Sequence, residues 1–243
     1  MDQFASVISM SEEIVEIARE TFQAVRGRDF TVPGIGMEFV WVPALNFWVG
    51  KFEVTNGEFR QYKPAHDSKK VEGLSLNSNR QPVLEVSYLD AIAYSQWMNV
   101  AAARHFDLPG GNRFRLPSVA EWKILARCGT DRKFPWGPEW PPPYGNFANQ
   151  EVFPSSWKLD GYVDKYPVTC VVEDSGKNEW GLFGMAGNVW EWTNDARANS
   201  RAVCGGAWTE VTDATLAVDV QGYAPADDEY DNIGFRLFLA PIQ

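Results

Sequence analysis

The spacing of apolar residues divides the chain into a helical start, a β-rich stretch and two further helices. A helix over residues 11–26 is predicted because Ser11 suits an N-cap and apolar residues then recur three or four positions apart: Ile14, Val15, Ala18 and Phe22. We assign residues 1–34 to this helix and a linker. Residues 35–243 are then expected to form a single larger domain.

From Met37 the sequence changes to short runs typical of strands, MEFVWVP and then NFWVGKFEV. Two helices follow, and each is opened by a serine with an acidic residue three positions later, the pattern of a capping box. The first begins at Ser87, with Asp90, and is expected to bury Ala91, Tyr94, Trp97, Met98 and Ala101. The second begins at Ser118, with Glu121, and is expected to bury Trp122, Leu125 and Ala126.

After Cys128 no helical pattern of useful length remains, and the chain breaks into short strands between stretches rich in Gly, Pro, Asn, Asp and Trp. The whole pattern predicts an α+β fold with few helices, short strands and many loops. Long loops inside a compact domain are usually functional or held in place by a further interaction.

Composition and charge exclude several classes of protein. The 243 residues are 45% hydrophobic, enough for a sizeable core, and carry a net charge of −10. This acidity argues against nucleic-acid binding. We expect no transmembrane segment, since no apolar run is long enough to span a bilayer. We also expect no signal peptide, because the start lacks a basic region, and we therefore place the chain in the cytoplasm by default.

Histidine and cysteine are too few for the common metal centres. His66 and His105 are the two histidines, so a three-histidine iron or zinc centre is impossible. Cys128, Cys170 and Cys204 are far apart in the sequence and form no CxxC motif, which argues against a cysteine zinc site. An odd number of cysteines cannot all pair within one chain, which favours a reducing compartment.

Nine blocks occur in the order typical of one family, over about residues 35–240. They are Met37–Pro43, Gly50–Asn56 with Phe59, Gln81–Val83, Phe114–Ser118 with Glu121 and Trp122, Phe134–Gly137, Asn178–Phe183, Gly187–Trp192, Gly205–Gly206 with Trp208, and Gly234–Arg236. In these blocks the chain resembles the formylglycine-generating enzyme, or sulfatase-modifying factor, family. The resemblance implies a variant of the C-type lectin fold. Within it, Arg236 is expected to pair internally with a carboxylate.

Catalytic members of this family hold copper(I) with two cysteines just after the glycine pair. Here Glu210 and Thr215 stand at the expected positions, and Cys204 lies before the glycines. Copper(I) selects soft thiolates, so no copper is expected and the resemblance implies a non-catalytic member. The related iron chemistry needs three histidines, which are absent. An atypical copper or iron oxidase, with Cys204 meeting another thiol in space, stays an alternative.

The resemblance also implies structural calcium, an ion that prefers carboxylate, amide and carbonyl oxygens. One site would use the Asn146 side chain, the Phe147 carbonyl, the Asp160 side chain and the Tyr162 carbonyl. The alternative is that Asn146 and Asp160 only hydrogen-bond turn backbone.

A second and weaker calcium site would use the Gly187 and Val189 carbonyls with the Glu191 carboxylate. The family's Asn ligand at this site is replaced by Gly184, which removes one side-chain oxygen.

The stretch between Arg201 and Arg236 holds no Lys or Arg and seven acidic residues. A charge run of this kind can simply be a solvated face. In the resembling fold, however, the stretch lines the ligand cleft, and in variable proteins of diversity-generating retroelements it is the diversified segment. The residues expected to bind a ligand are Trp208, Thr209, Glu210, Thr212, Asp213, Asp219, Tyr223, Asp227, Asp228, Tyr230 and Asp231.

Three functions follow from these observations. The leading hypothesis is a non-catalytic domain that binds a protein or other ligand of basic character through this C-terminal surface, in one version a diversified receptor-like protein. The second is the atypical oxidase. The third is a scaffold subunit that docks a basic partner without diversification.

Overall fold

Two sheets organise the computed structural model, which describes residues 23–148 and 158–242. The five-stranded sheet has the order β1 (Phe30–Thr31), β2 (Glu38–Val42), β3 (Phe47–Gly50), β11 (Phe238–Pro241) and β6 (Asn112–Arg115). The four-stranded sheet has the order β10 (Ile233–Gly234), β7 (Trp190–Arg197), β8 (Ser200–Cys204) and β9 (Gly222–Pro225). A separate two-stranded ribbon pairs β4 (Lys70–Val71) with β5 (Leu74–Ser75).

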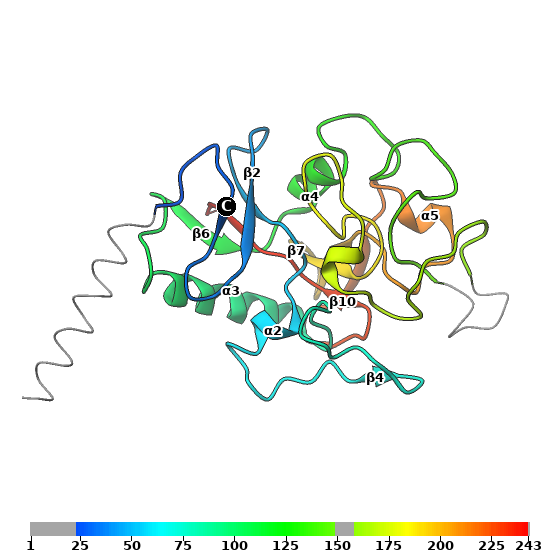
Figure 1. The fold of residues 1–243 in the computed structure, drawn as a ribbon, viewed down its shortest axis with the longest axis horizontal. Helices are drawn as coiled ribbons and strands as arrows, with labels where there is room; N and C mark the ends of the chain where they lie inside the picture. The colour runs from blue at the N-terminus through cyan, green and yellow to red at the C-terminus, as the bar shows by residue number, and fades with distance from the viewer. Residues whose placement is uncertain (1–22, 149–157, 243) are drawn as a thin grey trace, which may run out of the picture.

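The last strand of the chain lies in the middle of the first sheet. β11 pairs antiparallel with β3, where Phe238 faces Val49, and with β6, where Phe238 also faces Arg115. Its neighbour in sequence, β10, pairs parallel with β7 in the other sheet. The C-terminal residues therefore run from one sheet into the other and join them, as the red strand in Figure 1 shows.

Both helices predicted from serine caps are confirmed. α3 (Tyr88–Ala102) begins after Ser87, whose side chain forms a capping box with Asp90. α4 (Val119–Ala126) begins after Ser118 with the equivalent box to Glu121. α3 packs its Ala91, Tyr94 and Met98 into a buried cluster that includes Phe114 and Leu239 of the first sheet. The remaining helical elements are short: α2 (Asn56–Phe59), α5 (Asp213–Leu216) and a 3-10 turn at Val172–Asp174.

The prediction for the N-terminal region needs two corrections. Most of the predicted helix lies outside the described residues, but residues 23–26 are not helical, so its expected last turn is wrong. Part of the predicted linker is β1, which pairs with β2 through Phe30 and Phe39. The sheet therefore begins before residue 35, because Phe30 stacks on the Phe39 ring and packs against the core.

Loops without regular structure make up most of residues 129–148 and 158–189, as the sequence indicates. Figure 1 shows these green and yellow loops gathered on the side of α4 and α5. An aromatic cluster under them includes Phe134, Trp136 and Phe147, with the Phe134 and Trp136 rings stacked 4.9 Å apart. No helix among the described residues is both long and apolar enough to cross a membrane.

A buried ion pair lies where the two sheets, α4 and the loops meet. Arg236 and Glu191 are both inaccessible to solvent, and the Arg236 Nη2–H donates to Glu191 Oε1 over 2.6 Å. The Trp122 indole N–H donates to the same carboxylate at 2.8 Å. Arg236 also donates to the Gly50 carbonyl at 3.0 Å and to the Phe183 carbonyl at 2.6 Å. The internal carboxylate partner expected for Arg236 is thus confirmed.

Removal of the cationic partner should destabilise the protein strongly. We expect Arg236→Met to lower the free energy of unfolding by about 3–5 kcal/mol, because it leaves the Glu191 charge buried without compensation. The control is Lys51→Met, which breaks the half-exposed Lys51–Glu38 pair and should cost less than about 1 kcal/mol. Urea unfolding measures both values. Equal losses in the two variants would contradict the central role of the buried pair.

Candidate functional site

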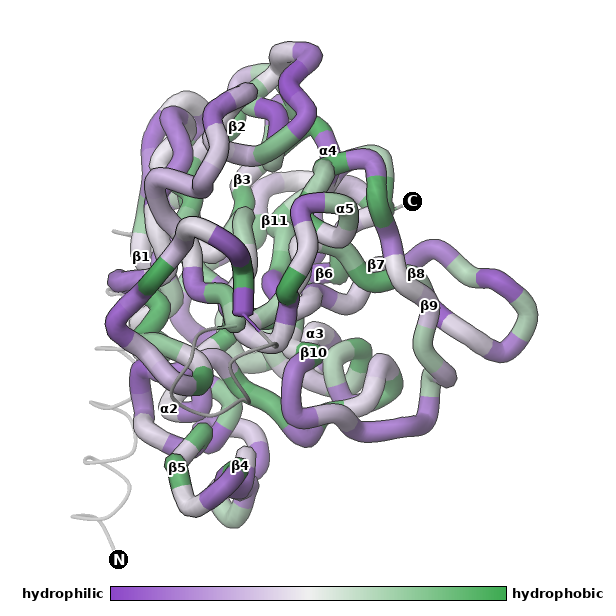
Figure 2. Tube along the Cα trace, turned by 90° about the vertical axis from the view of Figure 1, so that its right-hand side faces the viewer, coloured by the Kyte–Doolittle hydropathy of each residue, from purple (hydrophilic) through white to green (hydrophobic). Residues whose placement is uncertain are grey.

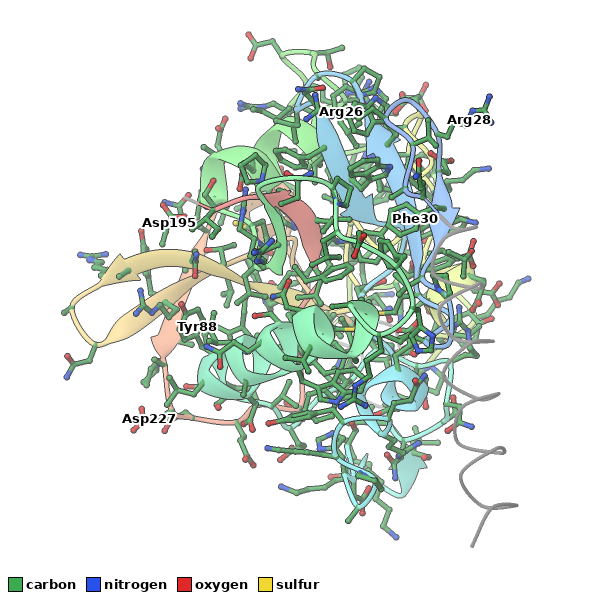
Figure 3. All side chains as sticks on the ribbon, turned by 90° about the vertical axis from the view of Figure 1, so that its left-hand side faces the viewer. Arg26, Arg28, Phe30, Tyr88, Asp195 and Asp227 are labelled. Atoms are coloured by element: carbon green, nitrogen blue, oxygen red, sulfur yellow. The ribbon has the colours of Figure 1, made fainter. Side chains whose placement is uncertain are left out.

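The acidic C-terminal segment follows three separate parts of the fold. Its first part carries α5, and its second is β9, which pairs with β8. Its third part is the acidic loop, residues 227–231, which runs beside the start of α3: the Leu89 N–H donates to the Ala226 carbonyl and the Glu85 N–H to the Tyr230 carbonyl. Figure 2 shows the connection from β9 to β10 as hydrophilic, and Figure 3 shows Asp227 on this connection beside the helix that carries Tyr88.

Most of the residues predicted to bind a ligand are accessible. Those that are exposed are Thr212, Asp213, Asp219, Tyr223, Asp227 and Asp228, and those that are half-buried are Thr209, Glu210, Tyr230 and Asp231. Trp208 is the exception, since it is only 2% exposed and packs in the core beside Val189. Its indole N–H donates to the Asp231 carbonyl, so Trp208 supports the acidic loop from the core, and its contact with a ligand stays a prediction.

Two of the predicted carboxylates are engaged in surface ion pairs. Asp213 pairs with Lys133 at 3.2 Å and Asp219 with Arg127 at 2.6 Å. The acidic loop is different, because its Asp228 accepts a hydrogen bond from the Tyr230 hydroxyl. Burial and the neighbouring Glu85 raise the pKa of the Asp231 carboxyl. Among the ion pairs of the described residues, none involves the acidic loop, although Glu229 lies near enough to Lys63 and Lys69 to help raise the pKa of both ammonium groups.

A cavity of about 310 Å³ lies against the first part of the segment. Its lining is Trp140, Leu159, Asp160, Val211, Thr212 and Asp213. The Trp140 side chain is one of the most exposed large apolar groups described, at 42%. The structure thus brings Asp160, predicted to bind calcium, together with Thr212 and Asp213, predicted to bind a ligand. An aromatic face beside two carboxylates and a hydroxyl suits a cationic group.

The positions of the copper ligands hold side chains with other partners. The Glu210 carboxylate accepts the Trp190 indole N–H at 2.8 Å. The Thr215 hydroxyl donates to the Thr212 carbonyl at 2.9 Å. A carboxylate and a hydroxyl are hard ligands that do not favour copper(I). These two residues do not fit the copper centre that the resemblance describes.

All three cysteines are free thiols in buried surroundings. Burial raises the pKa of the Cys204 thiol to about 12 and that of the Cys128 thiol to about 11, and it also raises the pKa of Cys170. Cys204 packs in an apolar cluster with Val40 and Phe238, whereas the Cys170 thiol lies beside the Asn188 side chain. Thiols held protonated in this way are poor nucleophiles and poor metal ligands.

The first predicted calcium site contains one buried side-chain oxygen that accepts no hydrogen bond. Asn146 is buried, its amide N–H groups donate to the Val168 carbonyl and the Asn188 side chain, and its Oδ1 has no hydrogen-bond partner. Buried amide oxygens are rarely left unpaired, so a ligand for Oδ1 fits the site. The Tyr162 and Phe147 rings pack together beside it, while Asp160 is exposed. This calcium site stays a prediction.

The second predicted calcium set is differently occupied. Both Glu191 carboxylate oxygens accept hydrogen bonds from Arg236, and one also accepts the Trp122 indole N–H, while the Gly187 carbonyl accepts the Val189 N–H. The Glu191 charge is therefore already balanced by a guanidinium group. The second set therefore offers a cation fewer uncommitted oxygens than the first set does. This second site also stays a prediction.

Glu53 is a buried carboxylate that the sequence reasoning missed. Its Oε1 accepts an N–H of the Asn188 side chain at 3.0 Å, and its Oε2 has no partner. A side chain at Gly184 would overlap this carboxylate, since an added Cβ would lie 2.2 Å from Oε1. Glu53 thus fills the space of the absent Asn ligand. The one signal in the sequence is a charged residue between two apolar ones, Phe52 and Val54.

The chain is similar to one known protein family and to single members of it. The model of the sulfatase-modifying factor enzyme 1-like domain matches residues 21–241. A mouse formylglycine-generating enzyme is 37% identical over 124 residues, which are 49% of this chain and 28% of that protein. A mouse inactive C-alpha-formylglycine-generating enzyme 2 is 30% identical over 220 residues, which are 86% of this chain and 62% of that protein. The chain spans less than two thirds of either relative.

Solved structures share the fold at lower identity. PvdO from Pseudomonas aeruginosa superimposes with a TM-score of 0.64 and 20% identity over 90% of this chain and all of that one. Treponema denticola variable protein 1 superimposes with a TM-score of 0.63 and 19% identity over 88% of this chain and 99% of that one. Both support the α+β fold with few helices and short strands that was predicted from the sequence.

Calcium should stabilise the protein through the first predicted site. A ligand present at about one hundred times its dissociation constant adds about 2.7 kcal/mol. We expect calcium to raise the melting temperature of the wild type and Asp160→Ala to abolish this rise. Asp213→Ala is the matched control, since it removes the other carboxylate of the same cavity. A rise that persists in Asp160→Ala would remove Asp160 from the site.

Stability without calcium should depend on the protonation of Glu53. Burial raises the pKa of this carboxyl from its ordinary value near 4.5 to about 7, so the folded state binds the proton more tightly than the unfolded state. The contribution of Glu53 to stability is then largest below about pH 4.5 and falls by about 3 kcal/mol as the pH rises to about 7. Glu53→Gln should flatten this slope in urea unfolding with a chelator present, and Glu38→Gln, which changes an exposed carboxylate, should not. An unchanged slope in Glu53→Gln would contradict this assignment.

Proposed function

The chain belongs to the sulfatase-modifying factor enzyme 1-like domain family, and we propose that it is a non-catalytic member that binds a protein or ligand of basic character through its C-terminal segment. The observation that carries the proposal is the pair of residues at the copper-ligand positions. Glu210 is held by Trp190, and Thr215 is held by its own turn. Without thiolates at these positions the oxidation of a substrate cysteine has no copper(I) centre.

Hydrogen bonds from neighbouring side chains hold the C-terminal segment in place. Trp190 fixes Glu210, Trp208 fixes the Asp231 backbone, and the Asn232 side chain donates to the Thr209 hydroxyl at 3.2 Å. Exposed positions between these anchors carry short side chains and Tyr223. A surface of this kind loses little conformational entropy when it binds.

The charge of the exposed positions supports a basic partner. The acidic loop has three consecutive exposed acids, Asp227, Asp228 and Glu229, and the cavity beside α5 adds Asp160 and Asp213. An acidic surface attracts basic partners and speeds their association. Calcium at the Asn146 site, in this proposal, stabilises the loops that carry Trp140 and Asp160.

A more specific form of the proposal is that the C-terminal segment is diversified. The fold that the chain shares with Treponema denticola variable protein 1 supports it. The undiversified alternative is a scaffold subunit with the same acidic surface. A neighbouring reverse-transcriptase gene and a near-copy of the final coding stretch would favour diversification, and an invariant segment among isolates would contradict it.

Binding through the acidic loop should be electrostatic. We expect Asp227→Asn with Asp228→Asn to weaken the binding of a short synthetic Lys/Arg-rich peptide about three- to tenfold, because two exposed charges are lost. The affinity of the wild type should fall as salt rises. Isothermal titration calorimetry measures both effects.

The matched control changes the net charge equally at exposed sites outside the acidic loop, with Asp131→Asn and Asp107→Asn, the latter beyond the C-terminal end of α3. This variant should bind the peptide nearly as well as the wild type. Equal losses in the two double variants would show that only net charge matters, and the acidic loop would not be the binding surface.

A further inference from the structure

A second cavity lies among the loops, apart from the C-terminal segment. It has a volume of about 270 Å³ and is lined by Tyr144, Gly145, Tyr162, Val163, Asp164, Lys165, Tyr166 and Asp174. Three tyrosines, two carboxylates and one lysine thus surround a space large enough for a small organic group. None of these residues belongs to the surface proposed above.

The hydroxyl groups of the three tyrosines are used within the protein. The Tyr144 hydroxyl donates to the Pro135 carbonyl at 3.2 Å and the Tyr162 hydroxyl to the Gly145 carbonyl at 2.6 Å. The Tyr166 hydroxyl donates to the Asp174 carboxylate. With their hydroxyls fixed, the tyrosines offer a ligand mainly their aromatic rings. Aromatic rings attract cations through their electron-rich faces.

Two of the rings are also held by packing. The Tyr144 ring lies so close to Gly176 that an added Cβ there would come within 2.4 Å of it, and the backbone at Gly176 has a φ of +86°. The Tyr162 ring packs edge-on against Phe147, with ring centroids 5.4 Å apart. The aromatic part of the lining is therefore formed before any ligand arrives, which lowers the entropic cost of binding.

Negative charge enters the cavity from two elements. The Asp164 carboxylate accepts the Phe147 and Tyr166 backbone N–H groups, each at 2.9 Å, and this fixes its position. The Asp174 carboxylate comes from the 3-10 turn, Val172–Asp174. Both carboxylates are therefore fixed in the lining of the cavity by hydrogen bonds within the protein, Asp174 through the Tyr166 hydroxyl and Asp164 through backbone N–H groups.

Among the lining residues, Lys165 is the one cation, and it is exposed. An anionic ligand would be repelled by the two carboxylates of this lining. We propose that this tyrosine cavity is a binding site for an organic ammonium or guanidinium cation, held by the Tyr144, Tyr162 and Tyr166 rings and by the Asp164 and Asp174 carboxylates. The cation is either a free amine or a side chain of a protein.

Titration with small probes tests the cavity directly. The probes are choline, its uncharged carbon isostere dimethylbutanol, and the amides of N-acetyl-lysine and N-acetyl-arginine, each followed by calorimetry and by NMR of the protein. We expect at least one of the cations to bind at least about tenfold more tightly than dimethylbutanol, since the isostere lacks the charge. If choline binds most tightly, the natural ligand is a free amine. If the lysine or arginine amide binds most tightly, the ligand is a protein side chain.

Three variants locate the site. Asp174→Asn removes one charge but keeps an acceptor for the Tyr166 hydroxyl, and Tyr166→Leu removes one ring, so each should weaken the best cation about three- to tenfold. Lys165→Gln should strengthen it, because it removes the competing positive charge. Asp131→Asn, which removes an exposed charge outside both the cavity and the acidic loop, should leave it unchanged.

Several results would overturn the proposal. They are equal binding of choline and dimethylbutanol, no binding by any of the cations in the millimolar range, or weaker cation binding by Lys165→Gln. Thermal melts of the variants exclude loss of folding as the cause. Because the acidic loop is tested with its own variants, a failure here would leave that proposal standing.

Discussion

The rest of the structure depends on the buried ion pair between Glu191 and Arg236. Glu191 lies on β7 and Arg236 on the connection between β10 and β11, and the guanidinium group reaches carbonyls of Gly50 and Phe183 that belong to the other sheet and to the loops. Trp122 of α4 completes it. Two charges can remain in a dry core only when their hydrogen bonds are satisfied. One interaction therefore fixes the relative positions of most parts of the fold.

A framework fixed in this way does not need its binding residues for stability. The acidic loop is anchored by backbone contacts to Glu85 and Leu89 and by the buried Trp208, none of which requires the side chains of Asp227 or Asp228. The same holds at the copper-ligand positions, where Glu210 and Thr215 make local hydrogen bonds. Loss of the metal ligands and variation of exposed side chains can then occur without loss of the fold.

Local signals in the sequence predicted the elements that are determined locally. Capping boxes at Ser87 and Ser118 gave both longer helices, and the ordered blocks gave the fold class. α2 was missed although Thr55 and Glu58 form the same box, because four residues make too short an apolar pattern. β1 was placed in the linker, since a two-residue strand is defined only by its partner.

The candidate site was harder to predict because burial and partners depend on distant residues. Trp208 was predicted to bind a ligand and lies in the core. The Glu53 carboxylate fills the space next to Gly184, a contact between residues far apart in the sequence. The aromatic cavity joins residues 144–145, 162–166 and 174, which share no motif. Sequence spacing gives the residue types of such sites, whereas the loops that bring them together are set by tertiary packing.

The most direct test of the central claim, that the domain kept its architecture without the thiolate copper centre, is a copper(I) titration. The folded protein and Cys204→Ser compete with a copper(I) chelator of known affinity under anaerobic conditions. We expect that neither protein takes copper from the chelator, because the Cys204 thiol is buried and protonated. A stoichiometric copper(I) complex that is lost in Cys204→Ser would contradict it.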